Sequence, residues 1–129
     1  MLTHLERHLV TILADPPQVT LATSGPAGIQ ACIVSCVVDG LRLLLLVPGT
    51  SDQLVNLEAA GAVVVANAHW QAHGRARVLE HAERLAALTL VPLPHAAWYA
   101  VVEVQPTRVT IAHPEGWGAV ETIDMDAYL

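Results

Sequence analysis

The sequence contains no lysine and no phenylalanine, and its net charge is −6. Its six basic residues are all arginine, and they are scattered along the chain except for Arg75 and Arg77. A protein that binds nucleic acid usually gathers basic side chains into a patch and adds aromatic rings that stack on bases. We therefore expect no nucleic acid as the main partner.

Long apolar runs are missing as well. The longest aliphatic run extends from Leu43 to Val47, whereas a membrane-spanning helix needs about 20 apolar residues. Glu6 and Arg7 interrupt the first residues, which lack the pattern of a secretion signal. The sequence therefore predicts a cytoplasmic protein with no membrane segment.

Cysteine is scarce, with Cys32 and Cys36 as its two positions. They are four residues apart in a predicted strand, where a rise of about 3.3 Å per residue places them about 13 Å apart. Because a disulfide requires Cα atoms within about 7 Å of each other, we expect two reduced thiols.

Several catalytic signatures are also absent. The chain has no G-x-S-x-G nucleophile motif, no glycine-rich phosphate-binding fingerprint and no H-E-x-x-H zinc motif. His4 and His8 have helical i, i+4 spacing, but no third ligand accompanies them, so we predict no metal site. The sequence leaves the catalytic residues unknown.

Hydrophobic residues, in contrast, make up 53% of the 129 residues. A chain of this length fits a single domain spanning residues 1–129. The hydrophobic share exceeds that of an ordinary soluble domain. This excess suggests that a second copy of the chain covers part of the apolar surface.

The spacing of apolar residues, together with Gly and Pro, predicts a mainly β chain with a few helices. We expect helices at 2–14, 51–60 and 81–91, and strands at 19–24, 29–38, 41–47, 62–68, 71–80, 98–104, 108–112 and 119–124. Asp39-Gly40 is a hairpin signal, Gly74 indicates a bulge or a close backbone approach, and Pro106 joins two strands. Six or more short strands with flanking helices indicate an antiparallel barrel.

The stretch from 41 to 67 is the most informative part of the chain. A hydrophobic strand ends at Val47, a Pro-Gly turn follows, and a short helix starts at Ser51. Free backbone N–H groups and the helix dipole converge at such a helix N-terminus, which can hold an anion. Where a phosphate-binding turn often carries Lys or Arg, this chain has Asp52 and Gln53.

The order and spacing of several motifs resemble the split-barrel flavoprotein family related to pyridoxamine 5'-phosphate oxidase. The motifs are VTLATSGPAGIQ at 19–30, the strand pair around Asp39-Gly40, TSDQLVNLE at 50–58, GRARV at 74–78 and VQPTRV at 104–109. The resemblance implies a split β-barrel of six or more antiparallel strands with flanking helices. It also implies a homodimer with FMN sites at the subunit interface, acting as an FMN-dependent oxidoreductase on a small molecule that the sequence does not name. In such a protein the flavin carries the redox chemistry and the protein positions it.

The resemblance further implies which residues contact FMN. The flavin ring would lie against two neighbouring strands, and the phosphate would lie near the strand–turn–helix. The expected ring contacts are Val34, Ser35, Cys36, Leu46, Val47 and Pro48; the expected phosphate contacts are Thr50, Ser51, Gln53 and Asn56; and further expected contacts are Trp70, Gln71 and Arg75.

Gln53 stands where the family pattern usually has Lys or Arg. Losing a charge-assisted contact would cost about 1.5–3 kcal/mol, roughly ten- to a hundredfold in affinity. Arg75 and Arg77 share a strand face and could supply a cation across the dimer. Alternatively, both form ion pairs with acidic neighbours: Glu80, Glu83 or Glu103. On the resemblance alone, Gln53→Lys is expected to tighten FMN binding.

A second hypothesis keeps the same scaffold without flavin chemistry, and the missing basic residue at position 53 is its main support. The chain would then be a non-enzymatic split-barrel dimer that has lost FMN or binds another cofactor, such as a deazaflavin or a haem. A haem would use a histidine as its axial ligand: His4, His8, His69 or His73. Trp98 and Trp117 are predicted to pack in the core or at an interface.

Overall fold

The computed structural model describes residues 18–90, 96–112 and 119–125. The helix expected at 2–14 and the side chain of Trp117 lie outside these residues. Within them are seven strands and two α-helices. In chain order the elements are β1 (Gln18–Thr23), β2 (Gln30–Asp39), β3 (Arg42–Pro48), α2 (Asp52–Ala59), β4 (Ala62–Ala66), β5 (Trp70–Val78), α3 (His81–Leu88), the short 3₁₀ turn Ala96–Trp98, β6 (Tyr99–Ala112) and β7 (Ala119–Asp124).

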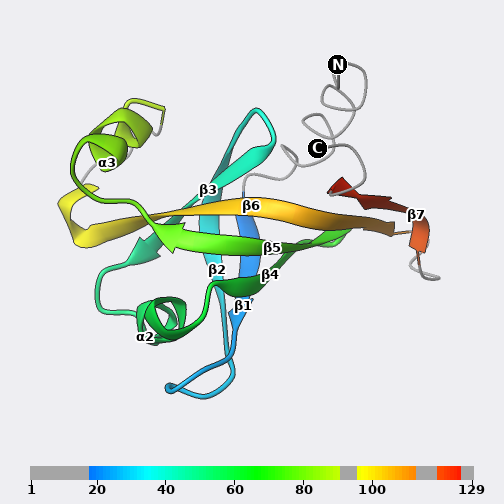
Figure 1. The fold of residues 1–129 in the computed structure, drawn as a ribbon, viewed down its shortest axis with the longest axis horizontal. Coiled ribbons are helices and arrows are strands. Elements are labelled where there is room, and N and C mark those ends of the chain that lie inside the picture. Colours follow the sequence, from blue (N-terminus) through cyan, green and yellow to red (C-terminus); the bar gives the residue numbers. More distant parts are fainter. Residues whose placement is uncertain (1–17, 91–95, 113–118, 126–129) are drawn as a thin grey trace.

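The strands form one antiparallel sheet that curls into a barrel (Figure 1). Its order is β3-β2-β1-β4-β5-β6-β7, and an additional pairing of β3 with β6 closes the first six strands into a ring. β7 pairs with β6 outside that ring. The predicted mainly β, antiparallel barrel with flanking helices is therefore confirmed.

Side-chain burial alternates along β5, because successive side chains of a strand point to opposite faces of a sheet. Trp70 and Ala72 are buried, whereas Gln71, His73 and Arg75 are exposed. Arg77 is exposed on the same face, so the predicted common face of Arg75 and Arg77 is confirmed. The outer face of β5 is thus polar and the inner face belongs to the core.

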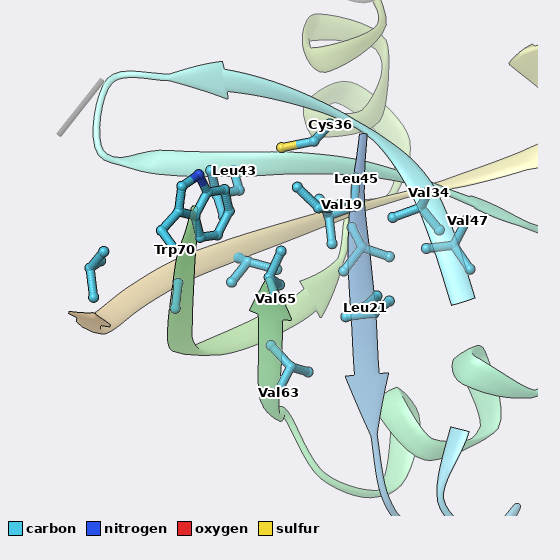
Figure 2. Close-up of a cluster of buried hydrophobic side chains, with 14 of the residues drawn as sticks. Val19, Leu21, Val34, Cys36, Leu43, Leu45, Val47, Val63, Val65 and Trp70 are labelled. Atoms are coloured by element: carbon cyan, nitrogen blue, oxygen red, sulfur yellow. The ribbon is translucent and has the colours of Figure 1, made fainter. Parts of the chain in front are cut away.

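The barrel interior is filled by aliphatic side chains packed around a single indole (Figure 2). Leu21, Leu43, Leu45 and Val65 are fully buried, and Trp70 is 1% exposed. Burying side chains of this size stabilises the fold by about 1.5–3 kcal/mol each, relative to leaving them exposed. The ring of strands is therefore held together mainly from inside.

β3 is buried on both of its faces, in keeping with its uninterrupted apolar sequence. Its outward side chains, Leu44 and Leu46, pack in a second cluster with Leu79, Ala87 and Val101. Ala87 comes from α3, so this helix covers the outer face of β3 and the neighbouring part of β6 (Figure 1). An apolar strand in an antiparallel sheet thus requires a helix on its outer side.

The hairpin between β2 and β3 is shifted by one residue from its prediction. Asp39 and Arg42 form the closing pair, so Gly40 and Leu41 are the central residues of the turn. Gly40 has a φ of 60°, a left-handed conformation that costs glycine little. The side chain of Asp39 binds Arg42, which holds both residues at the strand ends.

β6 is one continuous strand of 14 residues, although the sequence predicted two strands joined at Pro106. The ladder with β5 shifts register between His73 and Gly74, directly opposite this proline. A Cβ atom on Gly74 would lie 2.7 Å from the carbonyl oxygen of Gln105, so only glycine fits there. The predicted irregularity at Gly74 is confirmed, and it accommodates a proline that cannot donate to the ladder.

Candidate functional site

The residues predicted to bind a ligand fall into two groups by burial. Those with buried side chains are Val34, Cys36, Leu46, Val47, Gln53, Asn56 and Trp70, and those that reach solvent are Ser35, Pro48, Thr50, Ser51, Gln71 and Arg75. A buried side chain whose polar atoms already have partners has nothing left to offer a ligand. Each group is therefore considered by what its members contact.

The predicted ring contacts on β2 and β3 are brought together by the strand pairing. Ser35 pairs with Leu46, and its side chain is exposed. Val34 and Cys36, on either side of it, point into the barrel core. Burial raises the pKa of the Cys36 thiol to about 12, so this cysteine stays protonated at neutral pH. Both cysteines are free, as predicted.

The N-terminus of α2 is capped by Ser51, whose hydroxyl accepts a hydrogen bond from the Gln53 backbone N–H at 3.2 Å. The Ser51 N–H itself donates to the Pro48 carbonyl at 2.9 Å, and the Gly49 N–H donates to the Trp98 carbonyl at 2.8 Å. The Leu54 N–H donates to the Ser51 carbonyl. Most of the amide groups that an anion would need are thus already occupied.

Gln53 lies beneath α2 and is only 2% exposed. Its amide nitrogen donates to the Leu21 carbonyl at 2.9 Å and to the sulfur of Cys32 at 3.4 Å. Its amide oxygen accepts from the Thr23 hydroxyl. The side chain therefore faces the barrel and not the turn, and a lysine at this position would lose the acceptor for Thr23 and bury an ammonium group. This placement removes the basis for expecting Gln53→Lys to tighten FMN binding.

Asn56 is fully buried one helical turn further along α2. Its amide nitrogen donates to the Thr23 hydroxyl at 3.0 Å and to the Gly28 carbonyl at 2.8 Å, and its oxygen accepts from the Ala27 N–H at 2.9 Å. Thr23, Gln53 and Asn56 thus form a neutral, fully bonded network, which we call the α2 network. It fixes the helix to β1 and to the loop before β2, a structural task for two residues predicted to bind phosphate.

Trp70 is also unavailable to a ligand outside the barrel. Its ring lies in the core among Leu43, Val65 and Cys36 (Figure 2). Its indole N–H has no hydrogen-bond partner in the part of the chain that the structure describes. The stacking role suggested for Trp70 does not fit this position. Trp98, predicted to be core or interface, is 70% exposed.

The outer face of β1, β4 and β5 carries an open hollow of about 250 Å³. It is lined by Ala22, Thr23, Ser24, Ala62, Val63, Val64 and His73. Ala22 pairs with Val64, and Val64 pairs with His73, so these three side chains form one row across the sheet. The small side chains of Ala22, Ser24 and Ala62 in the lining leave the space open.

Arg75 stands beside this hollow. It lies two residues after His73 on the same exposed face of β5, and it pairs with the lining residue Ala62. Among the described residues, Arg75 and Arg108 are the arginines with no hydrogen bond or ion pair. Arg75 is therefore a cation free to meet a ligand.

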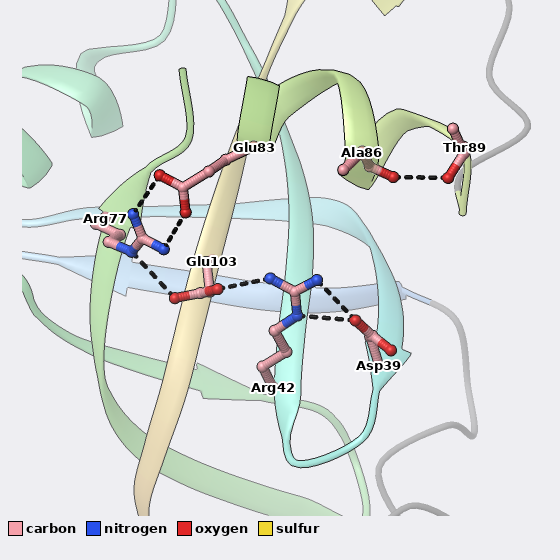
Figure 3. Close-up of polar contacts among 7 residues, drawn as sticks. All are labelled: Asp39, Arg42, Arg77, Glu83, Ala86, Thr89 and Glu103. Carbon is pink, nitrogen blue, oxygen red and sulfur yellow. Dashed lines mark hydrogen bonds and ion pairs between the residues drawn. The ribbon is translucent and has the colours of Figure 1, made fainter. Parts of the chain in front are cut away.

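Arg42 and Arg77 are committed to a second network, which we call the Glu103 network (Figure 3). Glu103 is 6% exposed and accepts hydrogen bonds from Arg42 at 2.7 Å and Arg77 at 3.1 Å. Arg42 also binds Asp39, and Arg77 also binds Glu83 of α3. The predicted alternative, ion pairing with Glu83 or Glu103, is thus confirmed for Arg77 and does not hold for Arg75.

The Glu103 carboxylate is ionised despite its burial. Burial alone would raise its pKa, but the hydrogen bonds from Arg42 and Arg77 and their positive charges outweigh this, so the net pKa is lowered. The partner Glu83 also has a lowered pKa, chiefly through its hydrogen bonds to Arg77.

Two other classes of site find no support in residues 18–90, 96–112 and 119–125. No group of three or more His, Cys, Asp or Glu side chains comes together there to hold a metal ion. None of the helices in these ranges is long and apolar enough to span a bilayer. Of the histidines considered for haem, His73 lines the hollow, and His69 lies in the turn before β5.

Sequence reasoning did not assign Thr23 or His73 to the FMN site, and it did not show that the side chains of Asp52 and Gln53 point in different directions. The orientation of α2 makes that separation: position 53 faces the barrel and position 52 is exposed. The one available signal was the helical repeat itself, which sets Gln53, Asn56 and Leu57 on one buried face.

Comparison with known proteins bears on the fold of the chain. No protein-family model matches the sequence, and none of the curated proteins matches it. A Clostridium acetobutylicum protein related to general stress protein 26, of the pyridoxinephosphate oxidase family, gives a TM-score of 0.70 at 11% identity over 98% of both chains. General stress protein 26 from Bacillus anthracis gives 0.67 at 13% identity, over 94% of this chain and 98% of that one. A heme binding protein from Mycobacterium smegmatis gives 0.71 at 22% identity, over 92% of this chain and 57% of that one. At identities this low, the structural comparison establishes the fold alone, which is a split barrel.

Proposed function

We propose that this chain, which has the split-barrel fold of the pyridoxamine 5'-phosphate oxidase family, forms a homodimer that binds FMN and acts as an oxidoreductase. The observation that carries the proposal is the hollow on the outer face of β1, β4 and β5, with the unpaired Arg75 at its edge. An exposed cation beside an open hollow suits a ligand with an anionic end.

One copy of the chain supplies only part of such a site. Pockets that enclose cofactor-sized ligands usually measure about 300–1,000 Å³, and this hollow is smaller. Two residues expected to flank the ring, Ser35 and Pro48, and the expected phosphate contact Thr50 lie on or after β2 and β3, on the other side of β1 from β4 and β5. In a homodimer, the β2–β3 side of one protomer would meet the β4–β5 side of its partner.

Apolar side chains left uncovered on β2 support this dimer. Ile33 is 72% exposed, and Ile29, just before the strand, is 88% exposed. Ala31 lies between them and pairs with Ala22 of the hollow. Exposed apolar side chains grouped on one sheet face are typical of an interaction surface.

The residues present fit the phosphate of FMN beside Arg75 but not at the turn before α2. Arg75 would hold the phosphate, whereas the turn before α2 offers few free amides and carries the carboxylate of Asp52. When bound, FMN supplies hydride or electron transfer. The chain positions the cofactor and, through the second protomer, excludes water from it.

The test begins with the absorbance of the purified protein and its titration with FMN and riboflavin. We expect the two-band spectrum of an oxidised flavin, and we expect Arg75→Gln to weaken FMN binding by about tenfold or more without changing riboflavin binding. Arg108→Gln, an exposed arginine one strand further from the hollow, is the matched control. A colourless protein that takes up neither flavin at micromolar concentration would sink the proposal.

Haem binding is a second candidate, because His73 lines the hollow and is exposed. Its ring nitrogen lies 3.0 Å from the Gln71 amide nitrogen, a contact that can orient an axial ligand. If the chain binds haem, added haemin will give a sharp Soret band that His73→Ala removes and His69→Ala retains. Such a protein would be the non-flavin dimer of the alternative hypothesis.

A further inference from the structure

The N-terminus of α2 would be the obvious place for a ligand phosphate in this fold, since a strand runs into a helix there. In this chain, most of the backbone N–H groups at this helix N-terminus already bond to acceptors of the chain itself. The backbone N–H groups of Gly49, Ser51, Gln53 and Leu54 all have acceptors within the chain. Only Thr50 and Asp52 keep backbone N–H groups with no acceptor among the described residues.

The charged side chain that faces solvent at this turn is Asp52. It is exposed in the first turn of α2, whereas Gln53 and Asn56 face the barrel. A carboxylate in the first turn already complements the positive end of the helix dipole. A phosphate brought to the same point would meet a like charge, which raises its free energy.

No described arginine without a bond lies at this turn: Pro48, before the turn, pairs with Tyr99 at the start of β6, whereas Arg75 pairs with Gln105 and Arg108 lies further along the same strand. Arg42 and Arg77 are held by Glu103, and Arg84 of α3 donates to the Tyr99 carbonyl at 2.7 Å. Arg75 lies on β5 beside the hollow, on the other side of β4 from β1. Lysine is absent from the whole sequence.

We infer that Asp52 is a specificity-determining residue that excludes phosphate from the N-terminus of α2. A phosphorylated ligand must then place its anion away from this turn. If the proposed function holds, on which this last step rests, the phosphate of FMN lies on the Arg75 side of the site.

The exclusion can be measured without any flavin, by titrating the labelled protein with inorganic phosphate and following backbone amide resonances by NMR. We expect no saturable shift at residues 49–54 of the unmodified chain. In Asp52→Asn we expect saturable shifts at Thr50 and its neighbours. Glu58→Gln, which removes a carboxylate from the other end of the same helix, is the matched control and should behave like the unmodified chain. Saturable shifts at 49–54 in the unmodified chain, or none in Asp52→Asn, would overturn the inference.

A second measurement compares FMN with riboflavin in the same variants. In the Arg75→Gln background, where the phosphate has lost its cation, adding Asp52→Asn opens the turn to the phosphate and should tighten FMN binding by about fivefold, the scale of a charge at a helix terminus, and leave riboflavin binding unchanged. An unchanged FMN affinity in a folded variant would count against Asp52. If neither flavin binds to any variant, the proposed function fails, while the phosphate titration still decides the inference.

Discussion

Both helices of the described chain are fixed to the barrel by polar groups, but the two attachments are built from opposite chemistry. The α2 network is neutral and buried, and every side-chain amide in it is bonded. The Glu103 network is charged and lies at the surface, where Arg77 and Glu83 are more than half exposed. α3 therefore relies on the apolar cluster around Leu44 and Leu46 for most of its attachment.

The two networks differ in the conditions under which they can contribute to the stability of the fold. Buried amides are costly to leave unpaired and are indifferent to pH and salt, so their loss should be felt under all conditions. Exposed ion pairs gain little net free energy and are screened by salt. Glu103 is intermediate, since it is buried while both of its arginine partners reach solvent.

The largest expected effect comes from breaking the α2 network. Asn56→Ala removes the partners of Thr23, Ala27 and Gly28 and should lower the free energy of unfolding by about 3 kcal/mol, because buried polar groups are left unpaired. Urea unfolding measures this loss, with Val55→Ala on the exposed side of the same helix as control, where we expect about 0.5 kcal/mol. Equal losses in the two variants would mean that the network adds nothing beyond the side chain itself.

Glu103→Gln should have an intermediate effect, and one that depends on pH. The variant loses the charge that holds Arg42 and Arg77, and we expect a loss of about 1–2 kcal/mol at neutral pH after allowing for the exposure of both arginines. Because the folded-state pKa of Glu103 is lowered from 4.5, its contribution is complete above that value and disappears as the pH falls through the folded-state pKa.

Urea unfolding measures the difference in the free energy of unfolding between the unmodified chain and Glu103→Gln. We expect this difference to be smaller at about pH 3 than at neutral pH. The corresponding difference for Asn56→Ala should stay constant over the same pH range, because no titrating group takes part in the α2 network. If the difference for Glu103→Gln is equally large in acid, the carboxylate stabilises the fold through packing and not through its charge.

The smallest effect is expected from Glu83→Gln, which removes the fully solvated end of the Glu103 network. The unfolding midpoint should fall slightly at low salt, and the difference should vanish at about 1 M salt, where charges are screened over about 3 Å. Thermal unfolding at the two salt concentrations measures it. A difference that persists in high salt would contradict the assignment of this contact to surface electrostatics.

The fold could be predicted well because local rules and the global arrangement agree. The spacing of apolar residues, together with Gly and Pro, predicted the strands, and the bounds of β7, 119–124, agree with the prediction to the residue. The break predicted at Pro106 failed for a non-local reason: Pro106 pairs with Gly74 where the ladder shifts register, with Thr107 as the extra residue on β6, and Gly74 is far away in the sequence.

The candidate site was harder to predict, because a motif does not say which way a side chain points. Gln53 and Asn56 were assigned to a ligand on the resemblance, yet the rotation of α2 turns both toward Thr23. Arg75 and Arg77 are alike in sequence, and only the approach of Glu103 from β6 separates the bound arginine from the free one. Such distinctions depend on contacts between residues distant in the chain.

The length of β6 also bears on how the chain reaches its fold. This strand pairs with β3 through its first half, with β5 along most of its length and with β7 at its end. The pairing of β6 with β3, which we call the seam, joins segments that are far apart in the chain. The chain must therefore lose the entropy of a long loop before this pairing can stabilise the fold. The early strands can assemble through short connections, but the ring stays open until β6 has been made. Closure of this seam is therefore the step that we expect to govern the folding rate.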